Sequence, residues 1–355
     1  MKLRIILLLL PLMLLFACTA CREETPEVRD GFVSNGDVFN YCIDSVPVSF
    51  SPGMQTIDAK SYYVEPDGVS ICALTDCLAE KNGRLLYFTD DSSLQFFEAG
   101  FVTVDGDLYY APEDGYLLMA AREQVVPIGD RLYAFDEDCR VIELTAGVQE
   151  LFGGLYYVPE DGIEIACPPE GVLLTEDALY YANADGSLAA DALIGYLHFG
   201  ADGRYTSGSE TLDEQVEALL TQAQADFTDP IEAFRLCYAY IRDHYRYISM
   251  AHYPAGSDDW AQSCAEIFFQ NGKGNCYCWA AAQMYCARRL GIQAYCVAGW
   301  EDNPHNDHAW VMAEINGAAY LFDAELEYAL DAHPDMFMAT LDSAYSYNGY
   351  YYYFP

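Results

Sequence analysis

The amino-acid sequence predicts two folded regions: an all-β region of repeated hairpins and, after it, a domain of helices and one β-hairpin. Three observations carry this prediction. An aromatic residue recurs every 23 or 24 residues between about residues 60 and 205, at positions 63, 87, 110, 133, 157 and 181. After residue 207 the apolar spacing changes to steps of 3 or 4. Near the C-terminus, Asn316-Gly317 separates two strand-like segments and is a strong two-residue turn.

The composition excludes some classes of protein and of partner. The chain has 355 residues, enough for two ordinary domains, and 52% of them are hydrophobic, which argues against disorder. Its formal net charge is -38. Such a surface repels phosphate groups, so we expect no nucleic-acid partner. The acidity is also an ordinary route to solubility.

The first 17 residues are typical of a secretory signal peptide. Lys2 and Arg4 precede an apolar run that ends at Phe16 and is too short to span a bilayer. The segment Leu15-Phe16-Ala17-Cys18 resembles a bacterial lipobox, which implies cleavage before Cys18 and lipidation of its sulfur; Cys21 is the alternative. We therefore expect a membrane partner through a lipid anchor, at the extracellular face of the bacterial cell membrane, with residues 18–30 as a tether.

The thirteen cysteines show no zinc-finger spacing, so we predict no metal site. Export would permit disulfides. Many of these cysteines nevertheless lie in apolar patterns, as Cys237 and Cys296 do, where cysteine behaves as a small core residue. We expect mostly free, buried thiols.

Residues 31–206 are predicted to form the hairpin repeats. The clearest units are Tyr62-Tyr63 with Asp67-Gly68, Tyr109-Tyr110 with Asp114-Gly115, Tyr156-Tyr157 with Asp161-Gly162, and Tyr180-Tyr181 with Asp185-Gly186. In each unit, alternating apolar residues lead into an Asp-Gly turn and another short apolar run, which indicates a β-hairpin. One hairpin cannot bury its face alone, so we expect neighbours to stack as a β-solenoid, with a small propeller as the alternative.

These repeats resemble the cell-wall-binding repeats of Gram-positive surface proteins, which share a Tyr-Tyr-x-x-x-x-Asp-Gly core. The resemblance implies a cell-wall polymer as partner, since that family holds choline or glucan in pockets of tryptophan and tyrosine. All four tryptophans of this chain, at positions 260, 279, 300 and 310, lie outside the repeats. The competing interpretation is therefore a spacer that holds the C-terminal domain off the membrane.

The C-terminal domain is predicted to occupy residues 207–355. Thr211-Leu212-Asp213-Glu214 has a capping-box pattern that opens a helix through about Ala223. Asp229-Pro230 opens a second helix with an N-cap and a proline in the first turn.

A cysteine lies at the start of a third predicted helix. Gly274-Asn275 breaks the chain, Cys276 follows, and the helical pattern continues to Leu290. The unpaired N–H groups at a helix start favour a thiolate and can bind an oxyanion. The rival is Cys278, about 200° around the same helix. From these residues alone, a structural cysteine remains an open interpretation.

A histidine and an aspartate fall on one face of the predicted C-terminal hairpin. Residues 308–315 and 318–323 form its strands around Asn316-Gly317, and in this register His308 and Asp323 are diagonal neighbours. An aspartate so placed can fix the imidazole tautomer. Glu325, directly opposite His308, is a rival carboxylate, and His305 in the preceding loop is a rival histidine.

Residues 211–330 resemble the bacterial transglutaminase-like superfamily. The matching motifs are Gly274-x-Cys276-x-x-Trp279-Ala280, Leu290-Gly291-Ile292, Val297-x-Gly299, His308-Ala309-Trp310 and Tyr320-x-Phe322-Asp323. The resemblance implies a papain-like α+β fold with Cys276 as nucleophile, His308 as base and Asp323 as orienting carboxylate. It favours Cys276 over Cys278, because position 278 matches a small residue. Alanine stands at 309 and 324, where many members have glycine and proline.

From the same resemblance we expect Trp260, Asn275 and Trp310 to line the cleft, although both tryptophans also suit a hydrophobic core. No cofactor is expected. Cys276 would attack an amide of a protein or peptide, such as a cell-envelope peptide, and water or an amine would resolve the acyl-enzyme. The enzyme would then be a peptidase or amidase, or a cross-linking transglutaminase. The alternative is a catalytically inactive, wall-associated adhesion or structural lipoprotein.

Overall fold

The computed structural model describes residues 29–119, 123–175, 177–250, 260–301, 307–330, 335–340 and 352–354. The predicted signal peptide, Cys18, Cys21 and His305 lie outside these residues. Within them, no helix is long and apolar enough to cross a membrane. Contacts between residues group the chain into two units, Met1–Thr103 with Tyr109–Met119, and Val104–Leu108 with Ala120–Pro355. The predicted boundary at residue 207 stays a prediction.

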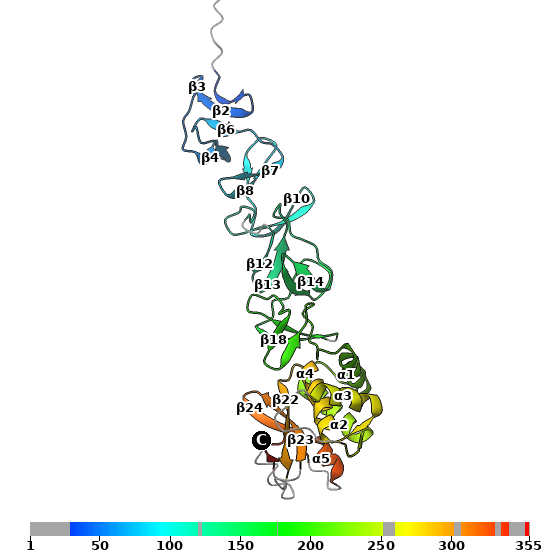
Figure 1. The fold of residues 1–355 in the computed structure, drawn as a ribbon. Helices are drawn as coiled ribbons and strands as arrows, with labels where there is room; N and C mark the ends of the chain where they lie inside the picture. Colours follow the sequence, from blue (N-terminus) through cyan, green and yellow to red (C-terminus); the bar gives the residue numbers. More distant parts are fainter. Residues whose placement is uncertain are drawn as a thin grey trace, which may run out of the picture. The chain divides into compact units, whose positions relative to one another are not determined.

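The repeat region consists of short antiparallel strands (Figure 1). They are β1 (Gly31–Asn35), β2 (Val38–Ile43), β3 (Val46–Pro47), β4 (Gly53–Ile57), β5 (Lys60–Val64), β6 (Ser70–Cys72), β7 (Cys77–Lys81), β8 (Arg84–Phe88), β9 (Leu94–Gln95), β10 (Gly100–Val104), β11 (Asp107–Ala111), β12 (Gln124–Ile128), β13 (Arg131–Phe135), β14 (Gly147–Leu151), β15 (Gly154–Val158), β16 (Gly171–Leu174), β17 (Leu179–Ala182), β18 (Ala192–Ile194) and β19 (Leu197–Phe199).

Each aromatic pair lies on the second strand of a hairpin. The sequence pattern instead predicts that the strand with the aromatic pair comes first and leads into the Asp-Gly turn. Tyr62-Tyr63 belongs to β5, which pairs with β4 across the two-residue turn Asp58-Ala59. Both turn residues have positive φ, 48° and 66°, as a type I′ turn requires. The predicted Asp67-Gly68 turn also forms, but it leads to a shorter pairing of β5 with β6 through Val64 and Ile71.

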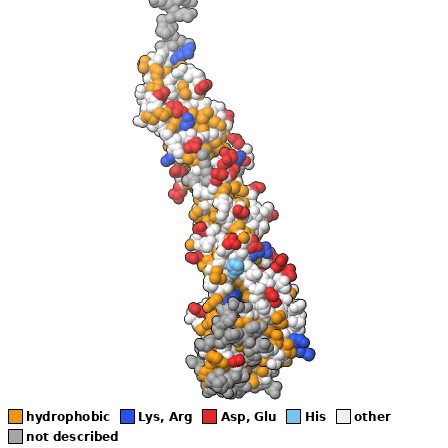
Figure 2. Space-filling view, viewed as in Figure 1, with side chains coloured by type: hydrophobic (Ala, Val, Ile, Leu, Met, Phe, Trp, Pro, Cys, Tyr) orange, Lys and Arg blue, Asp and Glu red, His pale blue; other side chains and the backbone are white. Residues whose placement is uncertain are grey.

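Single bridges join neighbouring hairpins of the repeat region. Leu132 of β13 bridges to Ile165, and Leu155 of β15 bridges to Leu188. Ile165 and Leu188 are both buried. Each of these two hairpins thus covers its apolar face with the repeat that follows it, as the stacking argument requires. On the face in view, Figure 2 shows Asp and Glu side chains scattered among hydrophobic ones along these repeats, with few Lys or Arg side chains.

The C-terminal part contains all five helices of the described residues and a four-stranded antiparallel sheet (Figure 1). Its elements are α1 (Glu210–Gln222), α2 (Pro230–His244), β20 (Arg246–Tyr247), α3 (Ala261–Asn271), β21 (Lys273–Gly274), α4 (Cys276–Arg289), β22 (Ala294–Glu301), β23 (Asp307–Ile315), β24 (Ala318–Phe322), α5 (Ala324–Ala329) and β25 (Tyr352–Tyr353). The sheet order is β24-β23-β22-β25. The predicted fold class, all-β hairpins followed by an α+β domain, is confirmed.

Two helices begin at residues that cap helices well, although one of them begins earlier than predicted. Asp229 caps α2 as predicted and accepts the N–H of Ile231 at 3.0 Å. Helix α1 begins two residues earlier than a capping box at Thr211 would place it. Its N-cap is Ser209, whose hydroxyl accepts the N–H of Leu212. Serine is a good N-cap residue, so either start is compatible with local propensity.

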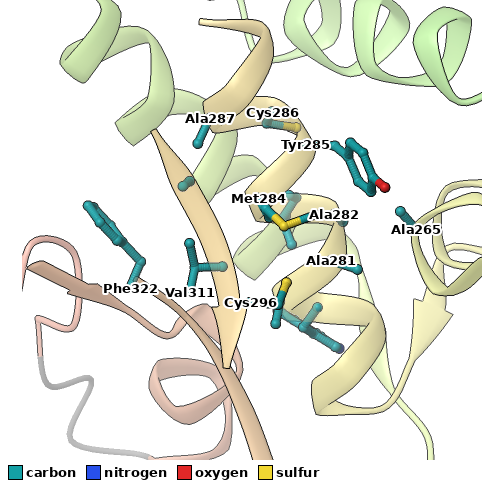
Figure 3. Packing of buried hydrophobic residues seen from close by; sticks show 14 of the residues in the cluster. Ala265, Ala281, Ala282, Met284, Tyr285, Cys286, Ala287, Cys296, Val311 and Phe322 are labelled. Atoms are coloured by element: carbon teal, nitrogen blue, oxygen red, sulfur yellow. The ribbon is translucent and has the colours of Figure 1, made fainter. Parts of the chain in front are cut away.

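Helix α4 forms the centre of the domain. Nearly all its residues are buried, and it packs against α3 on one side and against β22 and β23 on the other. Figure 3 shows this arrangement, with Ala265 of α3 and the sheet residues Val311 and Phe322 on opposite sides of the helix. Small side chains such as Ala281 and Ala282 let these layers approach closely.

We expect Gly291→Ala to lower the free energy of unfolding by about 1–3 kcal/mol. Gly291 follows α4 with φ +80°, and an added Cβ would lie 2.6 Å from Cγ1 of Val172 in β16. Gly317→Ala is the matched control, because Gly317 has φ +77° but no atom within 4 Å of the added Cβ. Urea unfolding followed by tryptophan fluorescence measures both. If both variants lose the same free energy of unfolding, the contact with Val172 contributes nothing and backbone strain alone explains the loss at Gly291.

Candidate active site

A buried imidazole–carboxylate pair joins β23 to the residue that follows β24. Nε2 of His308 in β23 lies 2.6 Å from Oδ2 of Asp323, and both residues are 2% exposed. An ionised carboxylate can only accept hydrogen bonds, so Nε2 carries the proton and donates it. Nδ1 is then the nitrogen that can act as a base.

The predicted register of the C-terminal hairpin is confirmed. Ile315 pairs with Ala318 across Asn316-Gly317, and Val311 pairs with Phe322. The strand β24 ends one residue earlier than predicted, because Asp323 becomes the N-cap of α5. Its Oδ1 accepts the N–H of Leu326 at 3.0 Å. Asp323 therefore both caps a helix and holds His308.

Because α5 starts after Asp323, the predicted rival Glu325 lies in a helical turn and not in a strand opposite His308. Its Oε2 is 3.7 Å from Nδ1 of His308, beyond hydrogen-bond distance. The geometry thus favours Asp323 over Glu325 as the partner of the imidazole.

Cys276 is the first residue of α4 and is 3% exposed. The preceding Asn275 caps the helix, because its Oδ1 accepts the N–H of Cys278 at 3.3 Å. Helix α4 packs against β23, which carries His308.

The rival thiol Cys278 lies in an environment that suppresses its reactivity. It is fully buried, and it hydrogen-bonds to Cys264 of α3. This contact and burial raise the pKa of Cys278 well above its usual range. Burial and Cys237 raise the pKa of Cys286 in the same way. These two thiols are therefore poor nucleophiles. Among the described residues, no cysteine forms a disulfide.

The three residues predicted to line a cleft are all buried. Trp260 is 4%, Trp310 1% and Asn275 0% exposed. Trp310 stacks beside His308, with ring centroids 6.1 Å apart and planes 24° apart. Trp260 meets Tyr277 of α4 edge-on at 5.1 Å. Their predicted contact with substrate stays a prediction.

Residues 217–323 match the family model of the transglutaminase-like superfamily. The match starts within α1 and ends at Asp323, so it contains Cys276, His308 and Asp323. No curated protein matches the chain.

The N-terminal region matches solved structures of choline-binding proteins. One is choline binding protein F from Streptococcus pneumoniae, with 18% identity, coverage of 50% of this chain and 58% of that one, and a TM-score of 0.31. Another is a pneumococcal cell-wall endolysin from phage Cp-1 complexed with choline, with 15% identity, coverage of 47% and 39%, and a TM-score of 0.20. The match covers less than two thirds of either protein.

The sequence prediction missed one residue that contacts Asp323. The hydroxyl of Tyr352 lies 2.7 Å from Oδ2 of Asp323, the same oxygen that His308 contacts. Tyr352 belongs to β25, which pairs with β22. The tyrosine-rich tail is visible in the sequence, but no local pattern distinguishes Tyr352 from its neighbours.

A second buried carboxylate fixes α5 onto the helical layer. Glu327 is 3% exposed and accepts hydrogen bonds from the hydroxyl of Tyr238 at 2.9 Å and from Arg242 at 3.0 Å, both in α2. Burial and the charge of Glu327 raise the pKa of Tyr238, which therefore stays a neutral donor. The network positions α5 and, through its N-cap, Asp323.

One group of described residues has side chains close enough together to hold a metal ion: His308, Asp323 and Glu325. Two of its donor atoms are already joined by the His308–Asp323 hydrogen bond. The expectation that the site needs neither metal nor cofactor stays a prediction.

Proposed function

We propose that the transglutaminase-like domain is a thiol acyl-transfer enzyme with Cys276 as nucleophile, His308 as base and Asp323 as orienting carboxylate. The observation that carries this proposal is the buried 2.6 Å contact between Nε2 of His308 and Asp323. It supports Nδ1 as the proton acceptor. The family match over residues 217–323 supports the same reaction class.

In the proposed reaction, Nδ1 of His308 takes the proton of the Cys276 thiol, and the thiolate attacks the carbonyl carbon of an amide. The N-terminal N–H groups of α4 stabilise the resulting oxyanion. The imidazolium then gives its proton to the leaving amine or ammonia, and a thioester remains. Water resolves the thioester to an acid, or a primary amine resolves it to a new amide, and the thiol is restored.

We further propose that the mature protein is attached to the extracellular face of the bacterial membrane through Cys18. The basic residues, the short apolar run and the lipobox-like sequence support this placement. A protein or peptide of the cell envelope is then the accessible substrate. The repeats act as a spacer or contact a cell-wall polymer, and the absence of tryptophan from them favours the spacer.

A thiol-reactive probe at neutral pH tests the proposed nucleophile. Cys276 is expected to react about tenfold faster than Cys167, an exposed thiol in the same chain, because the proposed base His308 would accept the proton of its thiol. Cys276→Ala should abolish the fast reaction, and Cys278→Ala should preserve it. Peptide mapping by mass spectrometry gives the rate at each cysteine.

If Cys276 labels no faster than Cys167, the inactive structural lipoprotein becomes the better description. For an active protein, incorporation of a fluorescent primary amine into a glutamine-containing acceptor separates cross-linking from hydrolysis. Product that contains the amine and requires Cys276 identifies a transglutaminase. Release of ammonia or amine without incorporation identifies a peptidase or amidase.

A further inference from the structure

We infer that Tyr352 is a positioning residue of the proposed thiol site and acts through the carboxylate of Asp323. The inference rests on the proposed function of Cys276, His308 and Asp323. It adds a fourth side chain, which lies outside the segment that matches the family model.

Asp323 is held from three elements. His308 of β23 lies 2.6 Å from Oδ2, Tyr352 of β25 lies 2.7 Å from the same oxygen, and the N–H of Leu326 in α5 donates to Oδ1. The carboxylate is 2% exposed, so protein donors must replace its lost water. Tyr352 supplies the hydroxyl donor of this set.

The hydrogen bond of Tyr352 restricts rotation of the carboxylate. Oδ1 has a backbone donor from α5, and Oδ2 has two donors that approach from different strands. Without the hydroxyl, Oδ2 keeps only the imidazole donor among these three contacts. The Asp323 side chain then holds the ring of His308 less firmly, and the tautomer with Nδ1 free to accept a proton is less strongly selected.

The surroundings of Tyr352 fix its ring independently of its hydroxyl. It is 4% exposed and packs edge-on against Trp310, with centroids 4.9 Å apart. Its strand lies close to Gly299 of β22, where an added Cβ would come within 2.3 Å of the carbonyl oxygen of Tyr353. A phenylalanine at position 352 retains the ring contacts, so the substitution removes the hydroxyl alone.

The test measures the rate of Cys276 alkylation from pH 6 to pH 10 in the full chain. Tyr352→Phe is expected to slow the reaction about tenfold near pH 7, since the lost hydrogen bond is to a charged group. The two rates should converge at the alkaline end, where the thiolate forms without help from the imidazole. Tyr353→Phe is the matched control on the same strand, because Tyr353 is 39% exposed. Its profile should match that of the unaltered protein.

Nitrogen NMR of the His308 ring supplies a readout that needs no activity, with the signal assigned by comparison with His308→Gln. In the unaltered protein the proton should reside on Nε2, and Tyr352→Phe should shift the population toward the other tautomer. Unchanged ring signals and an unchanged alkylation profile would overturn the inference. A rate lowered equally at every pH would also overturn it, as a purely structural effect. If Cys276 proves unreactive in the unaltered protein, the proposed function fails, and the ring signals alone decide the role of Tyr352.

Discussion

Asp323→Ala is expected to slow alkylation of Cys276 at pH 7 by about 100-fold, the scale of a lost general base. The substitution removes the acceptor of Nε2 of His308, so the ring is no longer held in the orientation that its proposed role as base needs. It also leaves the hydroxyl of Tyr352 and the N–H of Leu326 without their acceptor. We therefore expect the free energy of unfolding to fall by about 2–4 kcal/mol, from buried unpaired donors and a lost helix cap. Alkylation kinetics and urea unfolding measure the two effects.

Glu325→Ala is the control for Asp323→Ala, because its carboxylate lies 3.7 Å from the other imidazole nitrogen. We expect its effect on the alkylation rate to stay within about threefold, as for a weak charge–charge contact. A larger loss in Glu325→Ala than in Asp323→Ala would reverse the assignment of the orienting carboxylate.

Gly274→Ala is expected to destabilise the domain by about 3 kcal/mol, near the upper end of ordinary overpacking. An added Cβ would lie 2.4 Å from Cβ of Cys278 and 2.9 Å from Phe268 of α3. The backbone cannot easily move away. The carbonyl oxygen of Gly274 accepts the N–H of Ile248 at 3.0 Å and the indole N–H of Trp279 at 3.3 Å.

Gly272→Ala provides the comparison for Gly274→Ala within the same connection. Gly272 has φ +65° and no atom within 4 Å of an added Cβ, so alanine there adds only backbone strain of about 1 kcal/mol. Urea unfolding followed by tryptophan fluorescence reports on both, since every tryptophan lies in the C-terminal part of the chain. If the two variants are equally stable, α3 and α4 can separate more easily than their packing indicates.

Local chemistry explains which parts of the site could be predicted from the sequence. Asn316-Gly317 adopts positive φ at both positions, 54° and 77°, which selects a type I′ turn and fixes the register of β23 and β24. A turn of two residues allows only one such register, and that register alone predicts that His308 and Asp323 share a face. Likewise, Asn275 is a good N-cap and therefore places Cys276 at a helix start.

Other features of the structure could not be predicted from the sequence. At some positions two local preferences compete, and at others the contacting residues are far apart in the chain. The alternating pattern predicts that Asp323 ends a strand, although aspartate is also a preferred N-cap, and the cap prevails. In the repeats, the turn Asp58-Ala59 places an alanine at positive φ, which ordinary turn signals do not predict. Tyr352 contacts Asp323 across 29 residues. The tail contains several tyrosines, and the sequence does not distinguish the one that makes this contact.

The bridges between successive hairpins have an evolutionary consequence. Leu132 reaches Ile165 and Leu155 reaches Leu188, so each contact spans one unit and the start of the next. Duplication or deletion of one unit of 23 or 24 residues would recreate the same contacts at the new junction. Unequal recombination within the gene could therefore lengthen or shorten the region in fixed steps without altering the residues around Cys276. The number of units is then a trait that selection can adjust.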